Sequence, residues 1–214
     1  MKEKLKALFI GMKRQEAIDL VKEELESGTE PILILEVCRE AMAEIGKKFE
    51  TGEFFLSELI YSAEVFKAVS TILEPNLTSK RSEEKPKAIV VFGTPKGDVH
   101  DLGKNIVITM MRAQGFTVHD LGVDVPSEMF IDKLQDTGSN ILCLSALITP
   151  AFAIMKETIS LLSEKGLRND TFVMIGGGVT TEFARKEVGA DAQTLDPTAA
   201  IRLCKQYIQD RPVK

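Results

Sequence analysis

The sequence predicts an α/β fold in two parts: an N-terminal four-helix bundle and a C-terminal flavodoxin-like, doubly wound sheet of five parallel strands. In the first part, apolar residues recur at helical spacing, whereas after residue 87 short β-branched runs alternate with helix-length amphipathic stretches. Between them lies TSKRSEEKPK (78–87), a polar stretch without apolar periodicity that is typical of an interdomain linker. We therefore expect a helical domain over residues 1–80, a linker over 81–86 and a Rossmann-like domain over 87–214.

Four helices are expected in the N-terminal half. The first covers 4–12, and the second ends before Gly28, a suitable residue just past a helix end. The third begins near Pro31, which favours a first helical position, and runs to about Phe49. Ser57 is the expected N-cap of the fourth. Its predicted apolar stripe consists of Leu59, Ile60, Ala63, Phe66 and Val69.

The C-terminal half alternates between strand and helix. The strands are expected at 88–93, 117–122, 140–146, 172–177 and 192–195. The helices that follow them are expected at 102–114, 127–135, 150–165, 181–188 and 198–208. Right-handed crossovers place such helices on both faces of a parallel sheet, and the flavodoxin-like strand order 2-1-3-4-5 is the default.

Composition narrows the choice of environment and partners. The net charge of −5 and the absence of a basic stripe argue against nucleic acid as a partner. The longest apolar run, 141–155, contains Pro150 and is too short for a membrane span, and the N-terminus lacks the features of a secretion signal. No membrane contact is therefore expected. Three cysteines stand far apart among apolar neighbours: Cys38, Cys143 and Cys204. Because this spacing shows no disulfide framework, a reducing, cytoplasmic location is expected.

The most unusual loop follows the first strand and reads TPKGDVHDLGKN, with His100 between Asp98 and Asp101. It is not a phosphate loop, because its spacing is one residue too long, Asn105 replaces the metal-binding Ser/Thr and the carboxylates would repel a phosphate. A metal-ligating imidazole held by an acidic partner suits the pattern. The alternative is that one aspartate caps the helix while His100 is merely exposed or hydrogen-bonded.

Two further strand ends carry unusual residues. The third strand ends in Ser145, with Leu147 and Thr149 beyond it, and the fourth ends in a run of three glycines. Taken alone, a serine at a strand end satisfies local backbone and glycine makes a turn. Three adjacent glycines also leave a slot for a planar or extended group. Because ligands bind where the carboxyl ends of parallel strands meet, the three segments are expected to form one site.

Together, DVHDLG, SAL and GG resemble the DxHxxG…SxL…GG signature of the cobalamin-binding domain of methionine synthase and of the corrinoid proteins of methyltransferase and O-demethylase systems. The intervals, 104–144 between Gly103 and Ser145 and 148–175 between Leu147 and Gly176, are similar to those of that family. The resemblance covers residues 2–208 and is most specific in the C-terminal part.

The resemblance implies cobalamin as the cofactor, bound base-off, with His100 replacing the nucleotide tail as the lower cobalt ligand. Asp98 matches the carboxylate that orients this histidine, and the pair is assigned the catalytic role. The implied contacts of the buried tail are Ser145 and Leu147, with Gly176 and Gly177 making room for it. Thr149 is expected near the corrin edge. Further implied cofactor contacts are Asp101, Gly103 and Gly178.

One position departs from the pattern of methionine synthase. A serine there completes a relay with the histidine and the carboxylate, and the aligned residue here is Ala151. The third hydrogen bond of the relay is therefore expected to be missing.

The N-terminal half is similar to the helical cap of the same proteins. The segment GEFFLSEL resembles their GEFFLPEL, with Ser57 in place of the proline. Phe55 and Leu56 are accordingly candidates for contact with the upper face of the corrin, although such a pair at a helix start is often ordinary core.

The implied activity is methyl carriage, in which the cofactor alternates between methylcobalamin and cob(I)alamin. The chain lacks the clustered zinc ligands and barrel needed to activate a methyl donor, so we expect a shuttle between a substrate-specific methyltransferase and an acceptor methyltransferase. The donor class is a methoxyaromatic compound, a methylamine, methanol or a betaine, and the acceptor is tetrahydrofolate or a thiol. A reductive activating protein is the third expected partner.

Three other interpretations stay open at this point. A cobalamin-dependent sensor has a similar cap and domain, although no helix-turn-helix or basic segment accompanies them here. The small subunit of an adenosylcobalamin mutase ordinarily lacks a cap, so residues 1–80 argue against it. A flavodoxin-like domain without a cofactor would leave the joint occurrence of the three motifs unexplained.

Overall fold

The computed structural model describes residues 1–77 and 88–210. The chain divides into two compact units: the first is helical and the second contains a sheet with its helices. The predicted linker, 81–86, lies outside the described residues, so the predicted domain boundaries remain predictions. No helix in the described ranges is long and apolar enough to cross a membrane.

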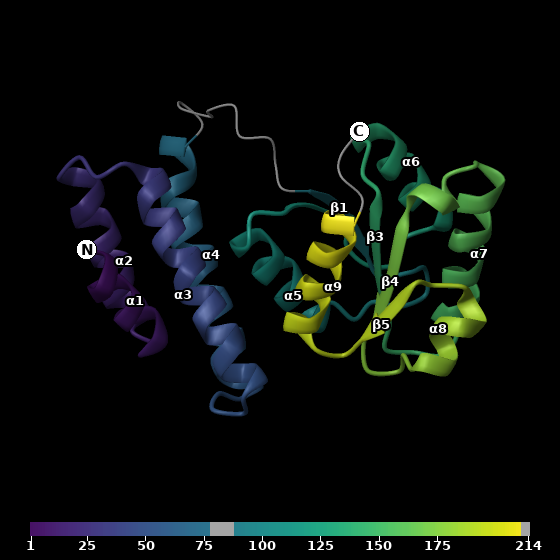
Figure 1. Cartoon of the computed structure of the whole chain (residues 1–214), viewed down its shortest axis with the longest axis horizontal. Helices are drawn as coiled ribbons and strands as arrows, with labels where there is room; N and C mark the ends of the chain where they lie inside the picture. Colours follow the sequence, from purple (N-terminus) through teal and green to yellow (C-terminus); the bar gives the residue numbers. More distant parts are fainter. Residues whose placement is uncertain (78–87, 211–214) are drawn as a thin grey trace. The chain divides into compact units, whose positions relative to one another are not determined.

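The first unit consists of four helices (Figure 1): α1 (Lys2–Ile10), α2 (Arg14–Glu26), α3 (Pro31–Glu50) and α4 (Leu56–Leu77). Two of the predicted boundaries are confirmed. Gly28 follows α2 with a φ of +88°, a left-handed conformation that glycine adopts without a steric penalty, and Pro31 is the first residue of α3. The largest fully buried side chains in this unit are Leu5, Phe9, Ile34, Met42, Ile45, Leu59 and Leu73.

The predicted start of the fourth helix is wrong by two residues. Helix α4 begins at Leu56, and its first turn is closed by the N–H of Phe55, which donates to Glu58 Oε2 at 2.9 Å. Ser57 lies inside this turn, where its hydroxyl donates to the same Glu58 oxygen at 3.0 Å. The third residue of the helix, a glutamate, thus satisfies the N–H of the residue that precedes the helix.

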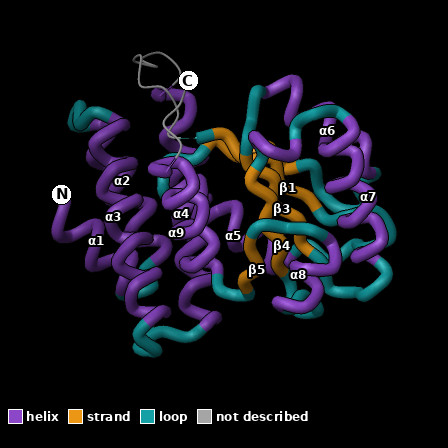
Figure 2. Tube along the Cα trace, turned by 45° about the vertical axis from the view of Figure 1, so that its right-hand side comes forward, coloured by secondary structure: helices purple, strands orange, loops and turns teal. Residues whose placement is uncertain are grey.

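The second unit is a five-stranded parallel sheet in the order β2-β1-β3-β4-β5, as predicted. Its strands are β1 (Ile89–Gly93), β2 (Thr117–Asp120), β3 (Ile141–Ser145), β4 (Phe172–Gly176) and β5 (Ala192–Thr194). Its helices are α5 (Leu102–Ala113), α6 (Ser127–Thr137), α7 (Ala151–Glu164), α8 (Glu182–Val188) and α9 (Pro197–Asp210). Figures 1 and 2 show α5 and α9 on one face of the sheet and α6, α7 and α8 on the other.

The strands are buried because helices cover both faces of the sheet. Alternate residues of the central strands, such as Val91, Leu144 and Val173, pack into the core beneath α6 to α8. Cys143, next to Leu144 on β3, is also buried. All three cysteines are buried and free.

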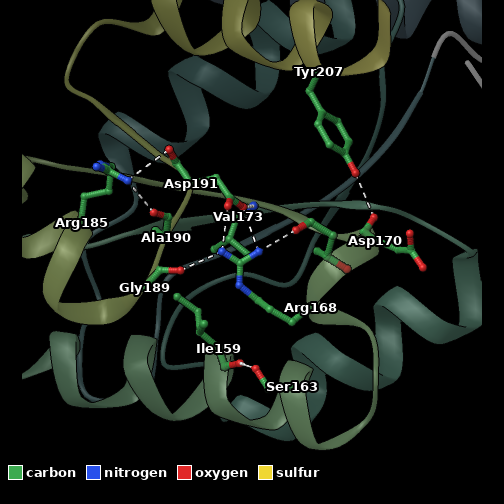
Figure 3. A network of polar contacts seen from close by, with 11 residues as sticks. Ile159, Ser163, Arg168, Asp170, Val173, Arg185, Gly189, Ala190, Asp191 and Tyr207 are labelled. Atoms are coloured by element: carbon green, nitrogen blue, oxygen red, sulfur yellow. Dashed lines mark hydrogen bonds and ion pairs between the residues drawn. The ribbon is translucent and has the colours of Figure 1, made fainter. Parts of the chain in front are cut away.

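A polar cluster at the amino ends of β4 and β5 joins two connections of the sheet (Figure 3). The Arg168 guanidinium, on the short 3-10 turn before β4, donates to both carboxylate oxygens of Asp191 at 2.8 and 3.1 Å. It also donates to the carbonyls of Gly189 and Thr171. Asp191 in turn accepts the N–H of Val173 at 2.7 Å. These bonds tie the segment before β5 to the segment before β4, on the edge opposite the predicted site.

Candidate functional site

The loop after β1 continues the pairing of the sheet beyond the strand itself. Thr94 donates its N–H to the Gly122 carbonyl and accepts the N–H of Val125, both at 3.0 Å. Lys96 donates its N–H to the Val125 carbonyl at 2.8 Å. Two loops at the carboxyl edge therefore support each other, and the segment that carries Asp98 and His100 rests on a hydrogen-bonded base.

Asp98 is fully buried, and both of its carboxylate oxygens are used twice. Oδ1 accepts the backbone N–H of His100 and contacts His100 Nδ1, each at 2.9 Å. The first of these bonds is a local turn that aspartate forms readily with the residue two positions on. Oδ2 accepts the N–H of Leu147 at 2.6 Å and that of Ile148 at 3.2 Å. The carboxylate thereby links the loop after β1 to the loop after β3.

The surroundings of Asp98 hold its carboxyl in the charged form. Burial by itself raises the pKa of this group, but the backbone N–H donors of Leu147, His100 and Ile148 and the imidazole of His100 outweigh burial. The net result is a pKa for Asp98 below the usual range of an aspartate. A carboxylate is therefore present beside the imidazole at neutral pH.

His100 presents the remaining nitrogen of its ring outward. About half of the side chain is exposed (53%), while Nδ1 faces the buried carboxylate. In the neutral ring this arrangement favours the proton on Nδ1 and leaves the lone pair of Nε2 available to a metal. In the described parts of the chain, no group of three or more His, Cys, Asp or Glu side chains is placed to hold a metal ion.

Ala151 occupies the position expected for a relay serine. It is buried at the start of α7 and offers no hydroxyl. Because each oxygen of Asp98 already engages two donors, the carboxylate is satisfied without a third side chain.

The loops after β3 and β4 approach each other closely, and the glycines permit it. Gly177 has a φ of +98°, and a Cβ there would lie 2.1 Å from the Ala146 carbonyl oxygen, so no other residue fits. A Cβ on Gly178 would meet a methyl group of Leu147 at 2.9 Å, and one on Gly176 the Thr194 carbonyl oxygen at 3.0 Å. The glycine run therefore packs against the segment that follows Ser145, the half-buried last residue of β3.

The remaining predicted residues have more exposed positions. Asp101 directly precedes α5, and its side chain accepts from Asn105 Nδ2 at 3.0 Å. Gly103 lies in the first turn of α5 with open space around the Cβ position, and Thr149 is exposed. Phe55 and Leu56 belong to the helical unit and are 71% and 49% exposed, so they are not core residues.

Exposed apolar side chains at this edge extend beyond Leu147, the one member of the set that the sequence predicted. Every large hydrophobic side chain that is exposed in the described part of the second unit follows the carboxyl end of a strand. These residues are Val99, Leu102, Met129, Leu147, Phe183 and Leu195. A set of apolar side chains on one edge is typical of a binding surface for a large, partly apolar molecule. The signal that could have found them is the occurrence of large apolar residues in the loops after the strands and in the first turns of the helices that follow.

The fold and this edge define a class of protein: a doubly wound domain with one oriented, half-exposed imidazole amid apolar side chains at the carboxyl edge of its sheet. Residues 88–201 match a family described as B12 binding domain, and residues 1–74 match a second family with the same description.

Relatives agree with this assignment. The chain is 34% identical over 196 residues to dimethylamine corrinoid protein 1 of Methanosarcina mazei, covering 91% of this chain and 90% of that protein. It is 43% identical over 165 residues to a corrinoid protein of Desulfitobacterium hafniense, covering 77% and 76%.

Two solved structures have a similar fold. A cobalamin-binding protein from Desulfitobacterium hafniense aligns with a TM-score of 0.72 at 30% identity, covering 97% of this chain and 98% of that one. A chain of the methanol:cobalamin methyltransferase complex from Methanosarcina barkeri aligns with a TM-score of 0.82 at 24% identity, covering 97% and 79%.

The chain belongs to the family of B12-binding corrinoid proteins, and its cofactor is cobalamin. The resemblance and the cofactor inferred from the sequence are thereby confirmed. The donor set fits this cofactor, because a single neutral imidazole nitrogen suits a metal whose other positions are filled by a macrocycle.

Proposed function

We propose that this protein is a methyl carrier that binds cobalamin base-off, with His100 as the lower cobalt ligand, and passes a methyl group between two methyltransferases. The observation that carries the proposal is the His100 imidazole, held through Nδ1 by a buried carboxylate and exposed on the carboxyl edge of the sheet. When bound, cobalamin supplies a cobalt atom that accepts a methyl group and releases it.

The Asp98–His100 pair is proposed to control whether the imidazole binds the cobalt. Asp98 holds the ring orientation and favours the proton on Nδ1, so that Nε2 keeps its lone pair. Uptake of a proton at Nε2 would remove that lone pair and with it the ability of the ring to ligate a metal. The pair therefore couples ligation to proton uptake, which makes the histidine a ligand that can both bind and leave.

The neighbouring loops are proposed to hold the rest of the cofactor. Ser145, Gly176 and Gly177 flank the region assigned to the nucleotide tail, with the Ser145 hydroxyl as a polar contact. Val99 and Leu102, 67% and 65% exposed on either side of His100, offer apolar surface to the corrin. Six further residues stay predicted contacts of the cofactor: Asp101, Gly103, Thr149 and Gly178, together with Phe55 and Leu56 of the helical unit.

The proposed partners are a substrate-specific methyltransferase, an acceptor methyltransferase that serves tetrahydrofolate or a thiol, and a reductive activating protein. Similarity to proteins named for dimethylamine, and to a chain of a complex named for methanol, supports the first of these. A methylamine or methanol is accordingly the donor class to test first.

The test replaces His100 by alanine in the full-length protein loaded with cobalamin. We expect His100→Ala to retain cobalamin, because the loops supply most of the contact, and to lose the visible spectrum of a histidine-ligated cobalt. His119→Ala is the matched control, since the chain contains only these two histidines and His119 lies on β2. An unchanged spectrum in His100→Ala would exclude His100 as the ligand.

A further inference from the structure

We infer that Asp124, in the loop after β2, is a positioning residue that sets the orientation of His100 by holding the backbone around Asp98. The inference rests on the proposed function, because it concerns how the ligand is aimed. Asp124 lies outside the sequence motif that marks the site, and its hydrogen bonds go to the neighbouring backbone rather than to the imidazole.

Asp124 forms hydrogen bonds with two consecutive residues of the loop that carries His100. Its carboxylate Oδ1 accepts the N–H of Gly97 at 2.7 Å, and its own N–H donates to the Asp98 carbonyl at 2.9 Å. The first bond uses the side chain and the second uses the backbone. Together they fix the chain on both sides of the Gly97–Asp98 peptide, from which the Asp98 carboxylate reaches His100 Nδ1.

The backbone of Asp124 has an unfavourable conformation that its surroundings must hold in place. Its φ is +56°, one of two left-handed values at non-glycine residues in the described chain, and Gly97 opposite it has a φ of +88°. A left-handed residue other than glycine is unfavourable unless its surroundings hold it, and aspartate and asparagine tolerate the conformation best. The side chain is exposed, so packing does not explain the residue. What it adds over a glycine is an acceptor for the Gly97 N–H.

Other hydrogen bonds hold the same loop and would remain in Asp124 variants. The buried Thr94 hydroxyl donates to the His100 carbonyl at 3.1 Å, and Leu147 and Ile148 still donate to Asp98 Oδ2. The loop is therefore expected to stay folded when the Asp124 side chain is removed. The change to look for is a looser Asp98–His100 bond.

The tautomer of His100 reports that bond directly. In the cofactor-free, full-length protein at alkaline pH, where imidazole is neutral, nitrogen NMR distinguishes a proton on Nδ1 from one on Nε2. We expect the Nδ1–H form to dominate in the wild type. In Asp124→Gly, which keeps the left-handed backbone but lacks the acceptor, the ratio of Nδ1–H to Nε2–H should fall about threefold to tenfold, as the weakening of one hydrogen bond implies. His119 serves as an internal reference.

Two control variants test whether the change in tautomer ratio comes from positioning by Asp124 rather than from its charge or from reduced stability of the protein. Asp124→Asn keeps an acceptor oxygen and tolerates the left-handed backbone, so its tautomer ratio should equal that of the wild type. Asp136→Gly makes the same exchange on the exposed face of α6 and lowers stability through helix propensity and the loss of an exposed ion pair with Lys133, so its ratio should also be unchanged. In the cobalamin-loaded protein, Asp124→Gly should show a smaller fraction of the histidine-ligated spectrum than the other two variants.

An unaltered tautomer ratio in Asp124→Gly, or a change of equal size in Asp124→Asn or Asp136→Gly, would overturn the inference. So would a wild-type His100 without a dominant Nδ1–H form. The tautomer measurement contains no cobalamin, so its failure is distinguishable from failure of the proposed function, which depends on the spectrum of loaded His100→Ala.

Discussion

Single residues at the carboxyl edge differ sharply in how much change they tolerate. Gly177 has no room for a side chain, because a Cβ would lie 2.1 Å from the Ala146 carbonyl oxygen at a left-handed φ. Gly103 has open space at the same point. The sequence motif contains both glycines, yet the structure requires only Gly177 for folding.

We expect Gly177→Ala to lower the free energy of unfolding by roughly 3 kcal/mol or more, because the backbones of two loops must separate. Gly103→Ala is the matched control. It should leave the stability of the cofactor-free protein unchanged or raise it by up to about 1 kcal/mol, because alanine favours a helix. Urea unfolding of both variants checks this. A lower affinity of Gly103→Ala for cobalamin, without loss of stability, would support its predicted contact, and equal stability of the two variants would contradict the close approach at Gly177.

The lowered pKa of Asp98 predicts how stability depends on pH. A carboxyl with a depressed pKa in the folded state contributes stability that is present above its unfolded pKa of about 3.9 and is lost as the pH falls through the folded value. Asp98→Asn should therefore be less stable than the wild type by about 2 kcal/mol at neutral pH, and this gap should close in acid. Urea unfolding of both cofactor-free proteins across the pH range measures the gap. A gap that stays constant down to acid pH would show that the charge of Asp98 contributes nothing.

At the level of elements, the connections of the sheet are held by backbone carbonyls and a few charged side chains. The Arg168 guanidinium joins the segments before β4 and β5 through Asp191, Gly189 and Thr171 (Figure 3). A planar guanidinium makes these bonds at once, which a lysine ammonium cannot do.

Arg168→Ala should accordingly lower the free energy of unfolding by about 2 kcal/mol, and Arg168→Lys should recover less than half of this loss. Lys133→Ala, which removes a long, exposed ion pair with Asp136, is the control and should change stability by no more than about 0.5 kcal/mol. Thermal or urea unfolding gives the comparison. Cobalamin binding should be unaffected in all three variants, because Arg168 lies at the amino ends of the strands. Reduced binding by a variant that keeps its full stability would argue against the assignment of the site to the carboxyl edge.

At the level of the whole molecule, the proposed function requires partners. The site provides one oriented imidazole and one buried carboxylate, and the carrier role proposed for them leaves activation of the methyl donor to another protein.

We expect the reduced, cobalamin-loaded protein to perform no catalytic turnover with methylated amines or methanol on its own. It should turn over many times when a cognate donor methyltransferase and an acceptor methyltransferase are added. Product formation in the four combinations of partner enzymes, with His100→Ala as a further control, measures this. Multiple turnovers by the protein alone would contradict the carrier proposal.

Most of the fold could be predicted from the sequence because its signals are local. Apolar spacing gave the helices and strands to within a few residues, and the observed strand order is the flavodoxin-like default for such a doubly wound sheet. The start of α4 was misassigned because two residues there, Ser57 and Glu58, can each cap a helix, and only the folded backbone selects between them.

Within the site, the sequence by itself determined which residues belong to the motif, since DVHDLG, SAL and GG are contiguous runs at characteristic intervals. Only the tertiary structure decided how they are held. The bonds from Leu147 to Asp98 and from Gly97 to Asp124 join residues that are far apart in the chain. The same is true of the close approach of Gly177 to Ala146. Such contacts depend on how the strand ends pack side by side, and no local pattern of residues encodes that distance.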